Sequence, residues 1–103
     1  MRTVQWDNKQ KSVIALAEIA GCSPEELIIT RNTTESLDTI IGGIHWQAGD
    51  EAIMAEQDYG AMLDMFKLVS ERHGVVNKMI SVPNHPKDDA EIVALYKNAI
   101  TPK

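Results

Sequence analysis

Four stretches with helical spacing of apolar residues alternate with three short apolar runs, and this alternation constrains the fold more than any other feature. Each stretch carries apolar residues at positions i, i+3, i+4 and i+7, the spacing of one face of an α-helix. The four stretches begin at Val13, Leu37, Met62 and Ile92. The runs between them, residues 27–30, 52–55 and 75–82, follow Gly or Pro within a few positions, as strands do. The expected order is α-β-α-β-α-β-α, which predicts an α/β fold with a mainly parallel sheet covered by helices.

Charge, cysteine usage and hydropathy exclude several classes of protein. Ten Lys and Arg against fifteen Asp and Glu give a net charge of −5, with no basic cluster, so nucleic acid is not an expected partner. A single cysteine, Cys22, excludes an intrachain disulfide framework and a Cys-rich zinc module. The apolar runs are far shorter than the ~20 residues that span a bilayer, and residues 1–12 lack a signal-peptide pattern. We expect a cytoplasmic protein with no membrane partner.

Hydroxyl-bearing side chains gather where the first apolar run meets the next helix. Residues 28–37 read Ile-Ile-Thr-Arg-Asn-Thr-Thr-Glu-Ser-Leu. The first-turn N–H groups of a helix lack internal partners and carry the positive end of its dipole. A phosphate there could accept hydrogen bonds from these groups and from the Thr33 and Thr34 hydroxyls. Asn32 and Glu35 also have the spacing of a capping box, which needs no ligand, and spacing alone favours the cap.

A second candidate site follows the second apolar run. Residues 56–62 read Glu-Gln-Asp-Tyr-Gly-Ala-Met, so Tyr59 begins the next helix at the sheet edge expected for Thr33 and Thr34. Its ring could lie flat on a planar ligand whose phosphate occupies the first site. The alternative, which the residues alone favour, is an aromatic side chain half-packed at a helix start. Asp58 could be the cap of this helix.

Other common sources of chemistry are weak in this sequence. His45, His73 and His85 have no metal-ligand spacing, and Cys22 has no basic neighbour in the sequence that would activate a thiol. Neither the GxxxxGK[ST] nor the GxGxxG fingerprint of nucleotide-binding loops occurs. We therefore assign no catalytic residue and no metal site from the residue pattern.

Three motifs together resemble the class V aminotransferases, which use pyridoxal phosphate (PLP) and include cysteine desulfurases and isopenicillin-N-epimerase-like proteins. The motifs are Arg-Asn-Thr-Thr-Glu-Ser at 31–36, Trp-Gln-Ala-Gly-Asp-Glu at 46–51 and Asp-Tyr-Gly-Ala-Met at 58–62. The match is closest to the epimerase-like branch, since desulfurases tend to have Ser-Gly-Ala-Thr-Glu at the first motif and a histidine at the third. The resemblance extends from about Lys9 to Lys103.

The resemblance implies both a fold and a site. The fold is the three-layer α/β/α major domain of fold type I (aspartate-aminotransferase-like), with residues 1–103 as a single partial domain, the N-terminal part of the PLP-binding large domain. In that fold the first strand borders the last strand of the sheet, and the second and third strands pair. Thr33 and Thr34 would hold the cofactor phosphate, and Tyr59 would stack on the pyridine ring. The role of Asp38, where many relatives have Asn, stays open.

The resemblance also implies what a fragment would lack. The lysine that forms a Schiff base with PLP and the acidic partner of the pyridinium nitrogen lie beyond Lys103 in the family. The lysines present match no such site, and we interpret them as solvated surface charges. The parent would be a homodimeric transaminase, epimerase or desulfurase acting on an amino acid, and the fragment alone would be inactive. The alternative is a self-contained flavodoxin-like α/β binding or regulatory module, in which Asn32 to Glu35 only cap a helix.

Overall fold

The backbone divides into two compact units. A computed structural model describes residues 2–103, with side chains from residue 5 onward. The N-terminal unit ends at Asn32, and the C-terminal unit runs from Thr33 to Lys103. Both candidate sites predicted from the sequence belong to the C-terminal unit, because its first residue is Thr33.

The N-terminal unit is a helix followed by one turn of 3₁₀ helix. Helix α1 (Arg2–Ala20) ends at Gly21, whose φ of 72° lies in the left-handed region expected of a glycine just past a helix. The turn η1 (Pro24–Glu26) contacts α1 and is tied at its start by the Glu26 carboxylate, which accepts a hydrogen bond from the Ser23 N–H at 2.8 Å. Val13 and Ala17, one turn apart on α1, are buried.

The prediction of a strand at residues 27–30 is wrong. Leu27 has extended backbone angles (φ −110°, ψ 131°), but the segment pairs with no strand within residues 2–103. Ile28 is 83% exposed. A strand forms only where a second strand pairs with it, and within residues 2–103 the sheet consists of β1 and β2 alone.

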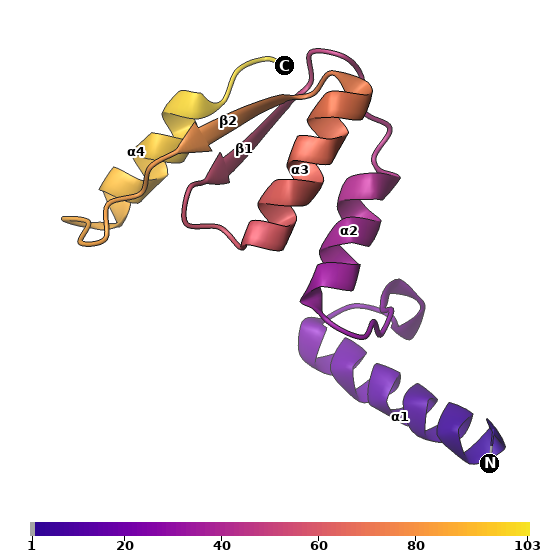
Figure 1. The fold of residues 1–103 in the computed structure, drawn as a ribbon. Helices are drawn as coiled ribbons and strands as arrows, with labels where there is room; N and C mark the ends of the chain where they lie inside the picture. The colour runs from indigo at the N-terminus through magenta and orange to yellow at the C-terminus, as the bar shows by residue number, and fades with distance from the viewer. Residues whose placement is uncertain (1) are drawn as a thin grey trace. The chain divides into compact units, whose positions relative to one another are not determined.

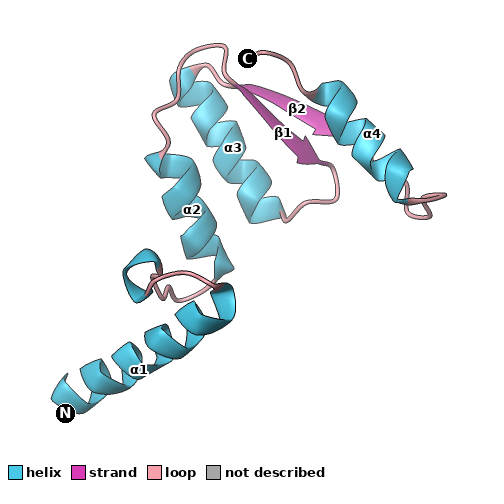
Figure 2. Ribbon diagram, turned by 180° about the vertical axis from the view of Figure 1, so that it is seen from behind, coloured by secondary structure: helices cyan, strands magenta, loops and turns pink. Residues whose placement is uncertain are grey.

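The C-terminal unit is built from three helices and a two-stranded parallel sheet. Its elements in chain order are α2 (Thr33–Gly43), β1 (Glu51–Ala55), α3 (Gly60–His73), β2 (Val76–Ile80) and α4 (Asp89–Ala99). The strands pair in register from Glu51 opposite Val76 to Ala55 opposite Ile80. Figures 1 and 2 show the sheet between α3 and α4, with α2 packed beside α3, which gives the predicted three layers. The expected pairing of the second and third strands is confirmed, although β2 ends at Ile80 rather than Val82.

The core of this unit joins α2, α3 and the sheet. Its buried members are Ile41, Ala52, Met54, Val69 and Val75. Partly buried side chains surround them, among them Trp46, whose ring meets Phe66 edge-on and whose indole N–H donates to the Ile41 carbonyl at 2.8 Å. Because Ile41 lies on α2 and Met54 on β1, this core sets where α2 lies relative to the end of β1.

Gly74 ends α3 in the left-handed region, with φ 72°. A Cβ at this position would lie 3.2 Å from the Cβ of Ala48, so a larger residue would also crowd the 44–50 loop. Gly74 is therefore the residue that ends α3.

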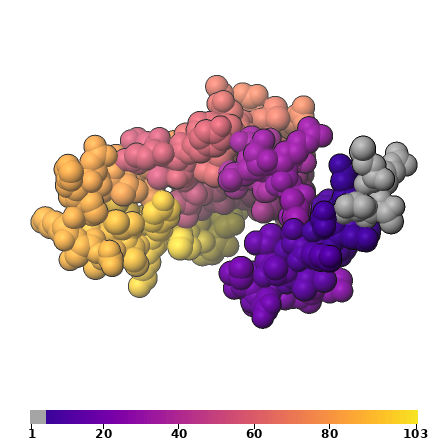
Figure 3. Space-filling model, turned by 90° about the horizontal axis from the view of Figure 1, so that it is seen from below, coloured from indigo at the N-terminus to yellow at the C-terminus, as the bar shows by residue number. Residues whose placement is uncertain are grey.

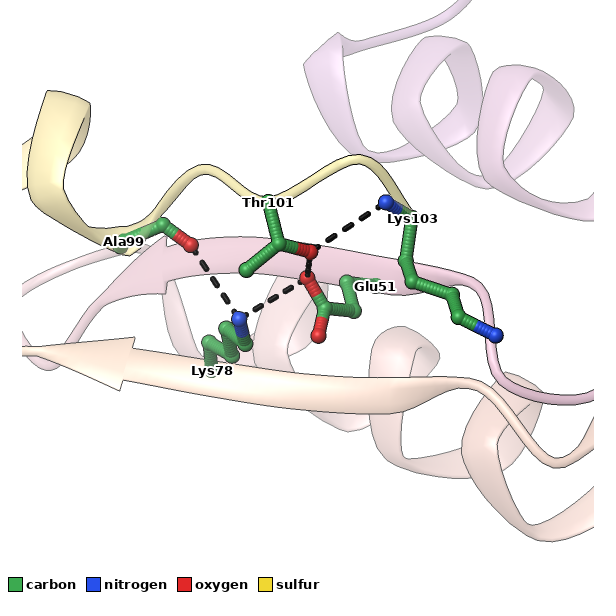
Figure 4. Close-up of polar contacts among 5 residues, drawn as sticks. All are labelled: Glu51, Lys78, Ala99, Thr101 and Lys103. Carbon is green, nitrogen blue, oxygen red and sulfur yellow. Dashed lines mark hydrogen bonds and ion pairs between the residues drawn. The ribbon is translucent and has the colours of Figure 1, made fainter.

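A polar cluster fastens the segment after α4 to the start of β1 (Figure 4). The Lys78 ammonium lies 2.8 Å from the Glu51 carboxylate and donates to the Ala99 carbonyl at 3.2 Å. The Thr101 hydroxyl donates to the same Glu51 oxygen. Lys78 is half-buried and paired, so its interpretation as a solvated surface charge is wrong. The hydrogen bond from Lys78, and after it that from Thr101, holds the pKa of the Glu51 carboxyl below its ordinary value.

Glu51→Gln should lower stability at neutral pH but not in acid. A depressed pKa means that ionised Glu51 stabilises the folded chain above its unfolded-state pKa, and that this contribution is lost as the pH falls through the lower folded-state value. The effect should be modest, because the pair is partly open to water. Urea unfolding at pH 7 and pH 3 measures it, with Glu71→Gln on exposed α3 surface as the control. An equal loss at both pH values would contradict the assigned role of the charge.

Candidate functional site

Helices α2 and α3 begin at the same end of the C-terminal unit. They are in contact, and Figures 1 and 2 show them side by side and running in the same direction. Helix α2 begins at Thr33, and α3 begins at Gly60 just after the carboxyl end of β1. Figure 3 views this end, where the surfaces of α2 and α3 adjoin. The structure therefore brings the helix starts that carry Thr33, Thr34 and Tyr59 to one end of the unit.

The three side chains differ in exposure. Tyr59 is 64% exposed, so its ring is not part of the core. Thr33 is exposed, and Thr34 is half-buried. An exposed ring can contact a planar ligand without first leaving a packed position.

The N-terminus of α3 is open to a ligand. Its N-cap residue is Tyr59, whose side chain makes no capping hydrogen bond. The Tyr59 carbonyl accepts hydrogen bonds from the N–H groups of Met62 (2.9 Å) and Leu63 (3.1 Å). The N–H groups of Gly60 and Ala61 have no hydrogen-bond partner within residues 2–103. These two donors carry part of the positive end of the helix dipole.

Helix α4 shows the opposite arrangement. The Asp88 carboxylate caps it by accepting from the Glu91 N–H at 2.9 Å, and the Glu91 carboxylate accepts from the Lys87 N–H at 2.7 Å. Two carboxylates at this helix start disfavour an anionic ligand. Of the helix starts after β1 and after β2, only the one after β1 is therefore suited to phosphate.

Asp58 is not the cap of α3, which corrects the sequence-based assignment. Its carboxylate accepts from the Ala55 N–H at 2.8 Å, and its own N–H donates to the Ala55 carbonyl at 3.0 Å. Both bonds turn the chain back on the last residue of β1, so Asp58 shapes the loop that leads to Tyr59.

Gln57 is a residue that sequence reasoning missed. Its side-chain amide donates to the Val82 carbonyl, and its carbonyl oxygen accepts from the Val82 N–H at 3.4 Å. The bridge joins the loop after β1 to the segment after β2. No sequence signal pairs this glutamine with a residue 25 positions away.

The described chain holds no cluster suited to a metal ion. Within residues 2–103, no three His, Cys, Asp or Glu side chains gather at one place, and His45, His73 and His85 are exposed. Cys22 is a free, half-buried thiol. None of the helices in this range is long and apolar enough to cross a membrane.

Comparison with protein families and curated proteins gives a consistent result. Residues 7–103 match the model of the family described as aminotransferase class-V. The chain is 27% identical over 89 residues to isopenicillin N epimerase of Streptomyces clavuligerus, covering 86% of this chain and 22% of the epimerase. It is 31% identical over 75 residues to a probable cysteine desulfurase 1 of Mycobacterium leprae (strain TN), covering 70% of this chain and 12% of that protein. The chain thus spans less than a quarter of either relative.

Two solved structures share the fold. One is a C-DES mutant with glycine covalently linked to the PLP cofactor, with a TM-score of 0.76. The other is the cystine C–S lyase C-DES in complex with its reaction product cysteine persulfide, with a TM-score of 0.78. Each is 24% identical to this chain and covers 94% of it, which is 26% of the longer chain. At this identity the likeness concerns the fold, and it agrees with the predicted fold type I architecture.

Proposed function

The chain belongs to the class-V aminotransferase family, and on that premise we propose that it forms the phosphate- and ring-binding part of the cofactor site of a PLP-dependent enzyme acting on an amino acid. The proposed reaction is a transamination, an epimerisation or a desulfuration. The observation that carries the proposal is the common end at which α2 and α3 begin, since it gathers hydroxyls, open helix amides and an exposed aromatic ring.

Thr33 and Thr34 are proposed to hold the cofactor phosphate. Hydroxyl and amide donors in the first turn of a helix suit a phosphate dianion, because they donate without bringing a charge that must be desolvated. The uncapped Gly60 and Ala61 amides of α3 add positive potential at the same end. These donors favour an anion, although Glu35 lies in the first turn of α2 and the whole chain carries a net charge of −5.

Tyr59 is proposed to stack on the pyridine ring. The Tyr59 side chain is 64% exposed, which leaves its ring accessible to a ligand. Because Tyr59 is the N-cap of α3, its ring would contact the pyridine close to the helix start. When bound, PLP supplies an electron-withdrawing ring that stabilises negative charge at the substrate Cα. The residues of this chain bind and orient the cofactor, and we assign no catalytic residue among them.

Tyr59→Ala should weaken PLP binding by roughly tenfold, the value of one stacking contact. The protein expressed from its complete reading frame is titrated with PLP, and binding is followed by the absorbance of the bound cofactor. Tyr59→Phe, which keeps the ring, should bind nearly as well as the wild type.

Tyr96→Ala is the matched control, because Tyr96 lies on α4 and is also partly exposed. It should leave the affinity for PLP unchanged. Failure of the wild-type protein to bind PLP would refute the proposed function, and equal affinities for Tyr59→Ala and Tyr59→Phe would refute the stacking role.

A further inference from the structure

The loop between β1 and α3 is fastened on both sides before it reaches Tyr59. On one side the Asp58 carboxylate accepts from the Ala55 N–H at 2.8 Å. On the other side the Gln57 amide bonds to both backbone groups of Val82. The two residues before Tyr59 therefore each use their side chain in hydrogen bonds, Asp58 to the end of β1 and Gln57 to the segment after β2.

The Gln57 bridge stands where the sheet ladder stops. The last backbone bond of the ladder runs from the Glu56 N–H to the Ile80 carbonyl at 2.9 Å. To continue the ladder, Val82 would need backbone partners from the segment after Glu56. That segment turns away toward α3 and does not supply them. The primary amide of Gln57 offers one donor group and one acceptor, as a peptide group does, and it takes up both groups of Val82.

We propose that Gln57 is a positioning residue for the cofactor ring: its bridge to Val82 fixes the loop so that Tyr59 presents its ring to the pyridine. The inference rests on the proposed function and adds a determinant of ring orientation, separate from the phosphate contacts at Thr33 and Thr34. A glutamine suits this task because glutamate could accept from the Val82 N–H but could not donate to its carbonyl, and leucine could do neither.

The test uses the protein expressed from its complete reading frame, with Gln57→Leu, Gln57→Glu and the control Gln47→Leu. Gln47 is exposed, and within residues 2–103 its side chain makes no hydrogen bond that the structure records. The two probes are pyridoxine 5′-phosphate, which has the ring and phosphate but no aldehyde, and inorganic phosphate. The readouts are the two dissociation constants, the circular dichroism of the bound ring, and hydrogen exchange at the Val82 N–H.

Gln57→Leu should bind pyridoxine 5′-phosphate about tenfold more weakly and with a reduced ring signal, while the affinity for inorganic phosphate stays within about twofold. Gln57→Glu, which keeps one of the two bonds, should lie between Gln57→Leu and the wild type. Gln47→Leu should match the wild type in every readout.

Three results would overturn the inference, and each is recognisable. Faster exchange at Val82 with an unchanged ring signal and affinity would make the bridge purely structural. Equal losses of affinity for both probes would mean a general loosening of the site rather than a change in ring orientation. A wild-type protein that binds neither probe would refute the proposed function itself, and the positioning role would be lost with it.

Discussion

Ile41→Ala is expected to lower the free energy of unfolding of the C-terminal unit by about 2–5 kcal/mol, the usual cost of such a truncation in a core. Ile41 is 4% exposed and packs in the buried cluster with Met54 and Val69. The lost methyl groups leave a cavity between α2 and its neighbours. Because small domains are stable by only about 5–15 kcal/mol, the change removes a large part of the total.

The neighbouring Ile40 offers a matched control. It lies on the same helix and loses the same atoms in Ile40→Ala, but its side chain is 62% exposed. Its replacement should change the free energy of unfolding by no more than about 0.5 kcal/mol. Urea unfolding followed by tryptophan fluorescence reports on this region, since Trp46 donates to the Ile41 carbonyl. Equal losses for the two variants would show that the buried cluster does not hold α2 in place.

The helices were predictable from the sequence because their signals are local. Apolar spacing at i, i+3, i+4 and i+7 predicted the four helices, which are confirmed as α1 to α4. The stops of α1 and α3 are equally local, since each helix is followed by a glycine, at 21 and 74, with φ of 72°. The family resemblance added the pairing of the second and third strands, which the parallel register of β1 and β2 confirms.

The features that could not be predicted all depend on residues far apart in the sequence. Residues 27–30 have the composition of a strand, but composition does not supply the neighbour that a strand requires. The Gln57 bridge to Val82 spans 25 positions, and the contact of Thr101 with Glu51 spans 50. Asp58 was assigned as a helix cap because it precedes a helix, whereas its carboxylate turns back to β1. Periodicity carries no information on such contacts.

For the candidate site, the sequence supplied residue types and the fold supplied their common location. The motifs around Thr33 and Tyr59 predicted two helix starts at one sheet edge, and α2 and α3 begin at one end of the unit. The roles of Thr33, Thr34 and Tyr59 toward PLP stay predictions. Binding measurements with PLP and with variants of these three residues test them.

Replacing Thr33 and Thr34 together with valine is expected to weaken PLP binding at least about 100-fold. A hydrogen bond to a charged acceptor contributes about 1.5–3 kcal/mol, so each hydroxyl on the phosphate accounts for roughly a tenfold change or more in affinity. Valine keeps the branched shape of threonine and replaces the hydroxyl with a methyl group, which leaves the packing of α2 nearly unchanged. Of the single variants, Thr34→Val should have the larger effect, because Thr34 is half-buried and Thr33 is exposed.

Thr39→Val in the same helix is the control for a lost threonine hydroxyl. Its hydroxyl donates to the Glu35 carbonyl at 2.7 Å within α2, and Thr39 itself lies in the second turn of that helix. PLP affinity, measured by titration of the protein from the complete reading frame, should be the same for Thr39→Val and the wild type. The double variant also separates the two interpretations of this helix start. If it destabilises α2 while PLP binds as before, the hydroxyls serve the helix itself; if PLP affinity falls while the unfolding midpoint holds, they serve the phosphate.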